Sequence, residues 1–192
     1  MSTRQKKIEE IEKAIKTYKP DVDAYPDDYF ALVTRMEVFK SVKEGNYGVG
    51  SLIVSPSGDI ISRGHNQVFK PYFRSDFHAE MIVLNYFEDQ YQDVNNMSGY
   101  KLYSSIEPCP MCVARLIATG GGTMKFVAPD ASGGMVQTMD KLPPGWINLS
   151  KGQSFLQAEA SHFIQELANE IFMFNLLGCW EKLFSRQCAA LR

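Results

Sequence analysis

Two short segments of the chain carry residue types that can hold a metal ion. They are His78-Ala79-Glu80 and Glu107-Pro108-Cys109-Pro110-Met111-Cys112. A catalytic zinc ion takes three protein ligands, often imidazole or thiolate, and leaves its fourth position to water. We therefore expect His78, Cys109 and Cys112 to bind Zn²⁺. The cation lowers the pKa of its water to near neutrality, which makes hydroxide available as a nucleophile.

Glu80 lies two residues after the predicted imidazole ligand and can act as a general acid and base. Hydroxide can attack an amidine-like ring carbon that carries an exocyclic amine. The amine leaves poorly until it is protonated, so the reaction needs a proton carrier. We expect Glu80 to take the proton of the water and to pass it to the ring and then to the departing ammonia.

The spacing of these residues predicts where helices begin. Cys109 and Cys112 are three apart, which places them on one face of a helix. Pro110 suits the first helical position, where its missing N–H group costs nothing. Cys109 is then the residue that caps the helix, whose N-terminus favours thiolates. His78 and Glu80 can converge only if His78 stands at the very start of its own helix.

Simpler interpretations of the same residues exist. A Cys-x-x-Cys pair can be a redox centre, or half of a closed structural zinc site. A structural site needs a fourth protein ligand, and no further thiol or imidazole lies near these segments in the sequence. The complete pattern favours a catalytic site.

Length and composition are those of one compact α/β domain with extensions. The chain has 192 residues, of which 45% are apolar and 22% are charged. Four cysteines, two of them in the predicted zinc site, do not make a disulfide framework, and a reducing cytoplasm suits them best. The N-terminus lacks the apolar segment of a signal peptide, and no apolar run could span a membrane. A net charge of −2 does not suit a dedicated nucleic-acid binder.

The first 66 residues predict two helices and a hairpin. An amphipathic helix is expected within residues 1–19, ended by Pro20, and a second helix within 27–43. We expect two strands at 51–55 and 60–66, joined by the turn residues Pro56-Ser57-Gly58-Asp59. The candidate core positions of the second helix are Phe30, Val33, Met36 and Val38.

Residues 67–77 form a predicted loop that leads directly to His78. Its aromatic side chains are interleaved with Lys70 and Arg74. Such a loop could stack on a base and hold a phosphate. The alternative is that its aromatic side chains pack on the domain.

The following residues alternate between helix and strand. We expect helices at 79–90 and 109–119 and strands at 100–104 and 124–128, the two strands being parallel because a helix separates them. Cys109 and Cys112 then follow the carboxyl end of a predicted strand, which is where ligands bind in open α/β sheets. Residues 129–153 read as a long loop with little regular structure, which is typical of functional lids.

Residues 157–192 predict an apolar helical tail, which Gly178 could split. Two stripes at helical spacing suggest a core helix or a subunit interface. They are Ile164, Leu167, Ile171 and Phe174, and Phe172, Leu176, Trp180 and Leu183. We divide the single domain 1–192 into N-terminal helices (1–45), a catalytic core (46–128), and the loop and tail (129–192).

The sequence resembles the cytidine deaminase-like superfamily, on the branch of cytosine, guanine, deoxycytidylate and tRNA adenosine deaminases. The zinc motif carries the resemblance, together with Val49-Gly50-Ser51-Leu52-Ile53-Val54, where Ala is common at the position of Ser51, and Gly64-His65-Asn66. It implies a three-layer α/β/α fold around a mixed five-stranded sheet, a Zn²⁺ cofactor, and homodimers or larger oligomers.

The same resemblance implies which residues bind substrate. It assigns a substrate contact to Asn66 and backbone contacts to Ser105, Ile106 and Glu107. We add Ser51 and Phe77 as candidate substrate-binding residues. In some members of the superfamily the C-terminal segment closes the pocket, so the region from Pro129 and the tail are candidates for substrate selection.

We expect a zinc-dependent hydrolytic deaminase, which removes the exocyclic amine of a purine or pyrimidine base, nucleoside or nucleotide. One alternative is a tRNA adenosine deaminase, which must extrude a base and hold a backbone. The net charge favours a small-molecule substrate over nucleic acid. The alternative of another class is a zinc-stabilised interaction module without catalysis, which would not need Glu80.

Overall fold

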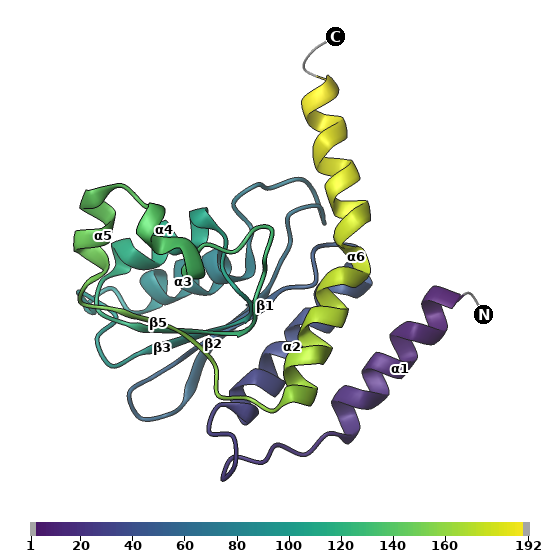
Figure 1. Cartoon of the computed structure of the whole chain (residues 1–192), viewed down its shortest axis with the longest axis horizontal. Helices are drawn as coiled ribbons and strands as arrows, with labels where there is room; N and C mark the ends of the chain where they lie inside the picture. Colours follow the sequence, from purple (N-terminus) through teal and green to yellow (C-terminus); the bar gives the residue numbers. More distant parts are fainter. Residues whose placement is uncertain (1–2, 190–192) are drawn as a thin grey trace.

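A five-stranded sheet forms the centre of the computed structural model, which describes residues 3–189 (Figure 1). The strand order is β2-β1-β3-β4-β5. The pairs β1–β2 and β1–β3 are antiparallel, whereas β3–β4 and β4–β5 are parallel. The mixed five-stranded sheet that we expected is therefore confirmed. The strands are β1 (Gly50–Val54), β2 (Ile60–His65), β3 (Lys101–Ile106), β4 (Thr123–Ala128) and β5 (Ser154–Gln157).

Helices cover both faces of the sheet. α3 and α4 pack on one face and α2 and α6 on the other, while α1 lies outside, beside the first half of α6 (Figure 1). No helix within residues 3–189 has the length and apolar character needed to cross a membrane. The α-helices are α1 (Thr3–Thr17), α2 (Asp28–Glu44), α3 (Ala79–Gln90), α4 (Pro110–Thr119), α5 (Pro144–Ser150) and α6 (His162–Ala189).

Alternation along the central strands fills two apolar cores. On β3 and β4, Leu102, Met124 and Phe126 pack with α3 and α4, because successive strand residues point to opposite faces. Val127 belongs to the second core, which includes Ile164 of α6. The carboxyl ends of β3 and β4 are thus fixed from both sides, and Cys109 and Cys112 follow β3 in the chain.

The segment 129–153 is more regular than we expected from its Gly, Pro and Ser content. It contains the 3₁₀ helix η1 (Val136–Lys141) and α5, and β5 follows directly, at the edge of the sheet beside β4. The prediction of a long irregular loop was therefore wrong over this part. Pro144 takes a place in the first turn of α5, where proline is tolerated, so composition alone misled.

Two further expectations need correction. Met36 is 51% exposed and faces solvent rather than the core. Gly178 does not split the tail, because α6 continues through it to Ala189. The glycine lies on an exposed part of the helix. It destabilises the helix by roughly 1 kcal/mol relative to Ala, and the packing of the other α6 residues offsets this.

Arg35 is a buried side chain with an unusual environment. It is 0% exposed, and within the described chain Nε and both terminal nitrogens of its guanidinium lack a hydrogen-bond partner. Leu32, Val38 and Phe39, each about one turn away, pack against apolar residues of α1 and α6. Arg35 thus occupies the seam between three helices, and this burial lowers the pKa of its guanidinium to about 9.

We expect Arg35→Met to stabilise the protein. The variant removes a buried group whose unmet hydrogen bonds cost about 1–3 kcal/mol or more, and it fills the seam with an apolar side chain. For a chain of this size, each kcal/mol corresponds to about 2–4 °C in Tm. Thermal unfolding measures the change, with the exposed Arg63→Met as the control, for which we expect almost no effect. A lower Tm for Arg35→Met would contradict this account of the seam.

Candidate active site

Two helix N-termini bring the predicted zinc ligands together. His78 caps α3 with an extended backbone (φ −71°, ψ 152°), and Cys109 caps α4 with a similar one (φ −71°, ψ 169°). Pro110 is the first residue of α4, and Cys112 lies in the first turn of that helix. His78 therefore stands at the start of its helix, where the sequence required it to be, and the dipoles of both helices favour anionic ligands there.

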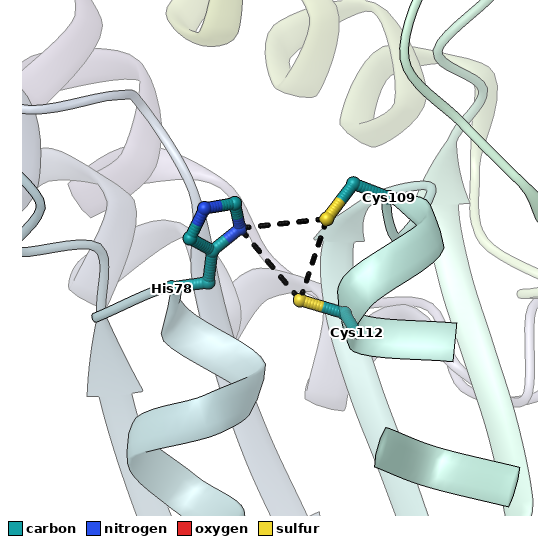
Figure 2. A group of neighbouring side chains, drawn as sticks. All are labelled: His78, Cys109 and Cys112. Atoms are coloured by element: carbon teal, nitrogen blue, oxygen red, sulfur yellow. Dashed lines mark hydrogen bonds between the residues drawn. The ribbon is translucent and has the colours of Figure 1, made fainter. Parts of the chain in front are cut away.

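The three ligand atoms form a nearly equilateral triangle. His78 Nδ1 lies 3.6 Å from Cys109 Sγ and 3.7 Å from Cys112 Sγ, and the two sulfurs are 3.7 Å apart (Figure 2). Tetrahedral ligands at ordinary Zn–N and Zn–S bond lengths lie about 3.6 Å (N to S) and about 3.8 Å (S to S) from one another. The donor set therefore fits zinc in both kind and spacing.

The protonation of the two thiols follows from their contact. The hydrogen-bond contact between Cys109 Sγ and Cys112 Sγ is the main cause that lowers the pKa of Cys109 to about 4, and His78 adds to it. The same contact, together with burial, raises the pKa of Cys112. Binding of zinc to both sulfurs releases the protons that the thiols carry, because a metal takes thiolates.

Glu80 lies against the ligand triangle without belonging to it. Its side chain is buried; Oε2 accepts a hydrogen bond from the Cys112 thiol at 3.6 Å, and Oε1 accepts one from the Ser104 hydroxyl at 2.9 Å. Burial raises the pKa of this carboxyl, which favours its protonated form. A buried carboxyl that can hold a proton beside a metal site suits proton transfer.

Ser104 of β3 is a positioning residue that the sequence did not reveal. It is fully buried, and its hydroxyl fixes one oxygen of Glu80 so that the other faces the ligand triangle. Ser104 lies on β3, the strand that leads to Cys109. The same strand therefore positions both the Glu80 carboxylate and a zinc ligand.

We expect Ser104→Ala to lower kcat by about tenfold or more while zinc stays bound. The hydroxyl donates to an ionisable group, and such hydrogen bonds contribute about 1.5–3 kcal/mol. Steady-state ammonia release together with zinc content measures the effect, and Ser104→Thr, which keeps the hydroxyl, should restore most of the rate. If Ser104→Ala lowers Tm but leaves kcat unchanged, the contact serves only the fold.

A cavity of about 200 Å³ opens onto the triangle and Glu80. Most of its lining is apolar, and among the described residues no lysine or arginine contributes to it. The lining residues outside the zinc site are Tyr47, Val49, Asn66, Ile106, Glu107, Asp130, Ser132, Gly133, Phe172, Leu176, Trp180 and Leu183.

Three of the predicted substrate-binding residues line this cavity. Asn66, Ile106 and Glu107 do so, and Asn66 is held by its Oδ1, which accepts a hydrogen bond from the Val68 N–H group at 3.1 Å. Within residues 3–189 the Asn66 side-chain NH₂ group has no partner, so it can donate to a ligand.

The other three do not line the cavity. The Ser51 hydroxyl is buried and donates to the Tyr103 carbonyl at 2.7 Å, and the Ser105 hydroxyl accepts from the Gly50 N–H group at 3.1 Å. The Phe77 ring lies under the Arg74 guanidinium, 4.0 Å from it. These side chains hold the strands and the loop together, which does not favour side-chain substrate contacts by Ser51 or Phe77. The backbone contact expected of Ser105 stays a prediction.

Glu107 organises the part of the cavity wall that follows β4. Its buried carboxylate accepts hydrogen bonds from the Asp130 and Gln137 N–H groups at 3.2 and 2.9 Å. A Cβ on Gly134 would lie 2.4 Å from Glu107 Cδ, so only glycine permits this close approach. Asp130 thereby reaches the cavity. The sequence offered only a weak signal for Asp130, its position directly after the carboxyl end of a predicted strand.

One stripe of α6 forms a wall of the cavity. Phe172, Leu176, Trp180 and Leu183 recur at spacings of three and four, so they share one face of the helix. The sequence singled out this stripe but left open whether it was core or interface. Trp180 and Leu183 remain 43% and 38% exposed, which places them at the open end of the cavity.

Comparisons with known proteins agree with this site. Residues 26–128 match the family model described as the cytidine and deoxycytidylate deaminase zinc-binding region. The chain belongs to this family. It is accordingly a zinc-dependent deaminase, a hydrolase that acts on C–N bonds.

Its curated relatives include two tRNA-specific adenosine deaminases. The protein of Aquifex aeolicus (strain VF5) is 29% identical over 148 residues, which are 75% of this chain and 95% of the relative. That of Bacillus subtilis (strain 168) is 30% identical over 118 residues, 60% of this chain and 70% of the relative.

Solved structures share the fold. One, from studies of A-to-I editing by tRNA:A34 deaminases, has a TM-score of 0.62 at 20% identity, covering 74% of this chain and 98% of its own. The guanine deaminase from Nitrosomonas europaea has a TM-score of 0.55 at 21% identity, covering 86% of this chain and 92% of its own.

Proposed function

We propose that this protein removes the exocyclic amine from a purine or pyrimidine carried by a small molecule, and that Glu80 is its proton carrier. The observation that carries the proposal is the buried Glu80 carboxyl, which lies against the triangle of His78, Cys109 and Cys112 at the floor of the cavity. A structural zinc site would have a fourth protein ligand there and no use for a carboxyl beside it.

The chain's own residues divide the work of the reaction. Zinc, when bound, supplies a water molecule that ionises near neutral pH. Glu80 would take one proton from water as the water oxygen bonds to the ring carbon, and pass it to the ring nitrogen. It would then take the remaining hydroxyl proton and give it to the amine as the C–N bond breaks. Water and the amino compound thus become a carbonyl compound and ammonia. The NH₂ group of Asn66 and the backbone near Ile106 and Glu107 orient the ring.

The size of the cavity supports a base as the buried part of the substrate. At about 200 Å³ it is smaller than most ligand pockets, which measure about 300–1,000 Å³. A planar base fits between apolar walls and a few polar groups, and a sugar would lie at the open end beside Trp180 and Leu183.

A second candidate is adenosine within tRNA. It is favoured by the two curated relatives, which are named tRNA-specific adenosine deaminases. A chain with a net charge of −2 would have to hold RNA through a local group of cations.

Ammonia release from a panel of substrates separates the candidates. The zinc-loaded protein is tested with guanine, cytosine and adenine, their nucleosides, deoxycytidylate and tRNA. Turnover of a small molecule supports the first proposal, whereas turnover of tRNA alone supports the second. Release from no member, by a protein that holds stoichiometric zinc, would reject both.

We further propose that the protein is a cytoplasmic homodimer. The two zinc-binding thiols must stay reduced, which a cytoplasm ensures. Met173, Leu177 and Phe184 of α6 are exposed apolar side chains at helical spacing, and such a stripe suits a subunit contact. Light scattering of the purified protein tests the dimer.

A further inference from the structure

Aromatic rings extend from the cavity to the surface of the loop 67–77. The Tyr47 ring lines the cavity and lies 5.6 Å from the Phe69 ring, which in turn lies 5.8 Å from the Phe73 ring. The loop is fixed at its base, since the Phe69 and Lys70 N–H groups both donate to Asn46 Oδ1. The three rings therefore form an ordered row that begins at the cavity wall.

The C-terminal half of α6, which projects past the sheet in Figure 1, places two cations on this row. Lys182 Nζ lies 5.1 Å from the Phe69 ring centroid, and the Arg186 guanidinium carbon lies 3.5 Å from that of Phe73. Leu183, which lines the cavity, directly follows Lys182 and is one turn from Arg186. The cations thus lie beside the open end of the cavity.

Neither cation of this row is neutralised by a carboxylate in the part of the protein that the structure describes. Lys182 and Arg186 form no ion pair within the described chain, unlike Lys125 and Arg74, which pair with Asp27 and Asp76. Lys182 Nζ uses one donor on the Gly45 carbonyl at 3.1 Å and has two left. A guanidinium that stacks on an aromatic ring points its N–H groups outward, parallel to the ring. These groups can therefore still donate to a phosphate.

We propose that Lys182 and Arg186, with the rings of Phe69 and Phe73, form a subsite for a phosphate attached to the base that is deaminated. The proposal rests on the proposed function and names the substrate class as phosphorylated. The base enters the apolar cavity, which lacks a cation, while the phosphate stays outside it. The phosphate can come from a nucleotide or from an RNA backbone, because both present the same anionic oxygens.

The test compares the parent with the double variant Lys182→Gln/Arg186→Gln. Each is assayed for ammonia release and for equilibrium binding with three probes on one base: the nucleoside, its 5′-monophosphate, and a short RNA that contains it. The control is Lys6→Gln/Lys13→Gln, which makes the same change of charge on exposed positions of α1. Zinc content and Tm are measured for all proteins.

We expect the parent to prefer a phosphorylated probe over the nucleoside by at least about tenfold in kcat/KM or in Kd. The double variant should lose this preference, mainly through KM, and the control should keep it. If RNA is the source, the plot of log K for RNA binding against log salt concentration should be less steep for the double variant than for the parent. The difference in slope should be about 1.4, because two phosphate contacts are lost. If the double variant loses the preference for the monophosphate, the phosphate comes from a nucleotide. If it loses only the preference for RNA, the phosphate comes from a polynucleotide.

Two results would overturn the subsite. One is an equal preference for phosphate in the parent and the double variant. The other is an equal loss with all three probes, which would show that the cations only hold α6 against the loop; Phe73→Leu, which removes the ring but keeps both charges, should then behave like the double variant. If no protein releases ammonia, the proposed function fails, while the binding comparison still decides the subsite.

Discussion

Glu80→Gln is expected to leave zinc bound and to reduce ammonia release by about 10²- to 10⁴-fold. The range is that of general acid–base catalysis by a well-placed side chain. Glutamine has nearly the same shape as glutamate and can still accept the Ser104 hydrogen bond, so the fold should persist. It cannot take a proton from water at neutral pH. Turnover on the best substrate of the panel and zinc content per chain measure the two effects.

Glu88→Gln is the matched control. Glu88 belongs to the same helix, α3, but is exposed and pairs with Arg115, so the same chemical change there should leave turnover almost unaltered. If Glu80→Gln releases ammonia at the rate of the parent, another group carries the proton. If it loses zinc, Glu80 contributes to metal binding, and the division of roles in the site would have to be redrawn.

Cys109→Ser is expected to abolish stoichiometric zinc binding and, with it, activity. A serine hydroxyl is a poor ligand at neutral pH because it stays protonated, whereas the low pKa of Cys109 makes it the readier thiolate of the pair. Loss of a partner outside the ligand shell already costs about 10–100-fold in metal affinity or activity, so loss of a ligand should cost more. Metal analysis after dialysis against a zinc buffer measures the change.

Cys188→Ser provides the comparison. Its thiol is exposed near the end of α6, and no ligand of the site contacts it, so zinc and turnover should match those of the parent. Full zinc occupancy in Cys109→Ser would remove Cys109 from the ligand set. The closeness of the three donor atoms would then reflect only hydrogen bonding between thiols and imidazole.

From the sequence alone we predicted His78, Cys109 and Cys112 as zinc ligands, Glu80 as the neighbouring acid, and the order of helices and strands around them. The structure brings the three donor atoms together beside Glu80. These predictions were possible because the information is local. His78 and Glu80, like Cys109 and Cys112, are separated by two or three residues, and the start of a helix fixes how such a pair lies. Strands β3 and β4 could also be predicted, because each is a short segment that follows a glycine-containing loop, and the helix between them indicated that they are parallel.

Tertiary structure alone decided what surrounds the metal. Asp130 reaches the cavity because Glu107 binds the chain that follows β4, and Trp180 reaches it because α6 packs on a face of the sheet and extends past it (Figure 1). Ser51 was a candidate substrate-binding residue, but its hydroxyl donates a hydrogen bond to a carbonyl of the neighbouring strand. Contacts of this kind join residues far apart in the chain, and no local pattern records which side chains the packing of the elements brings together.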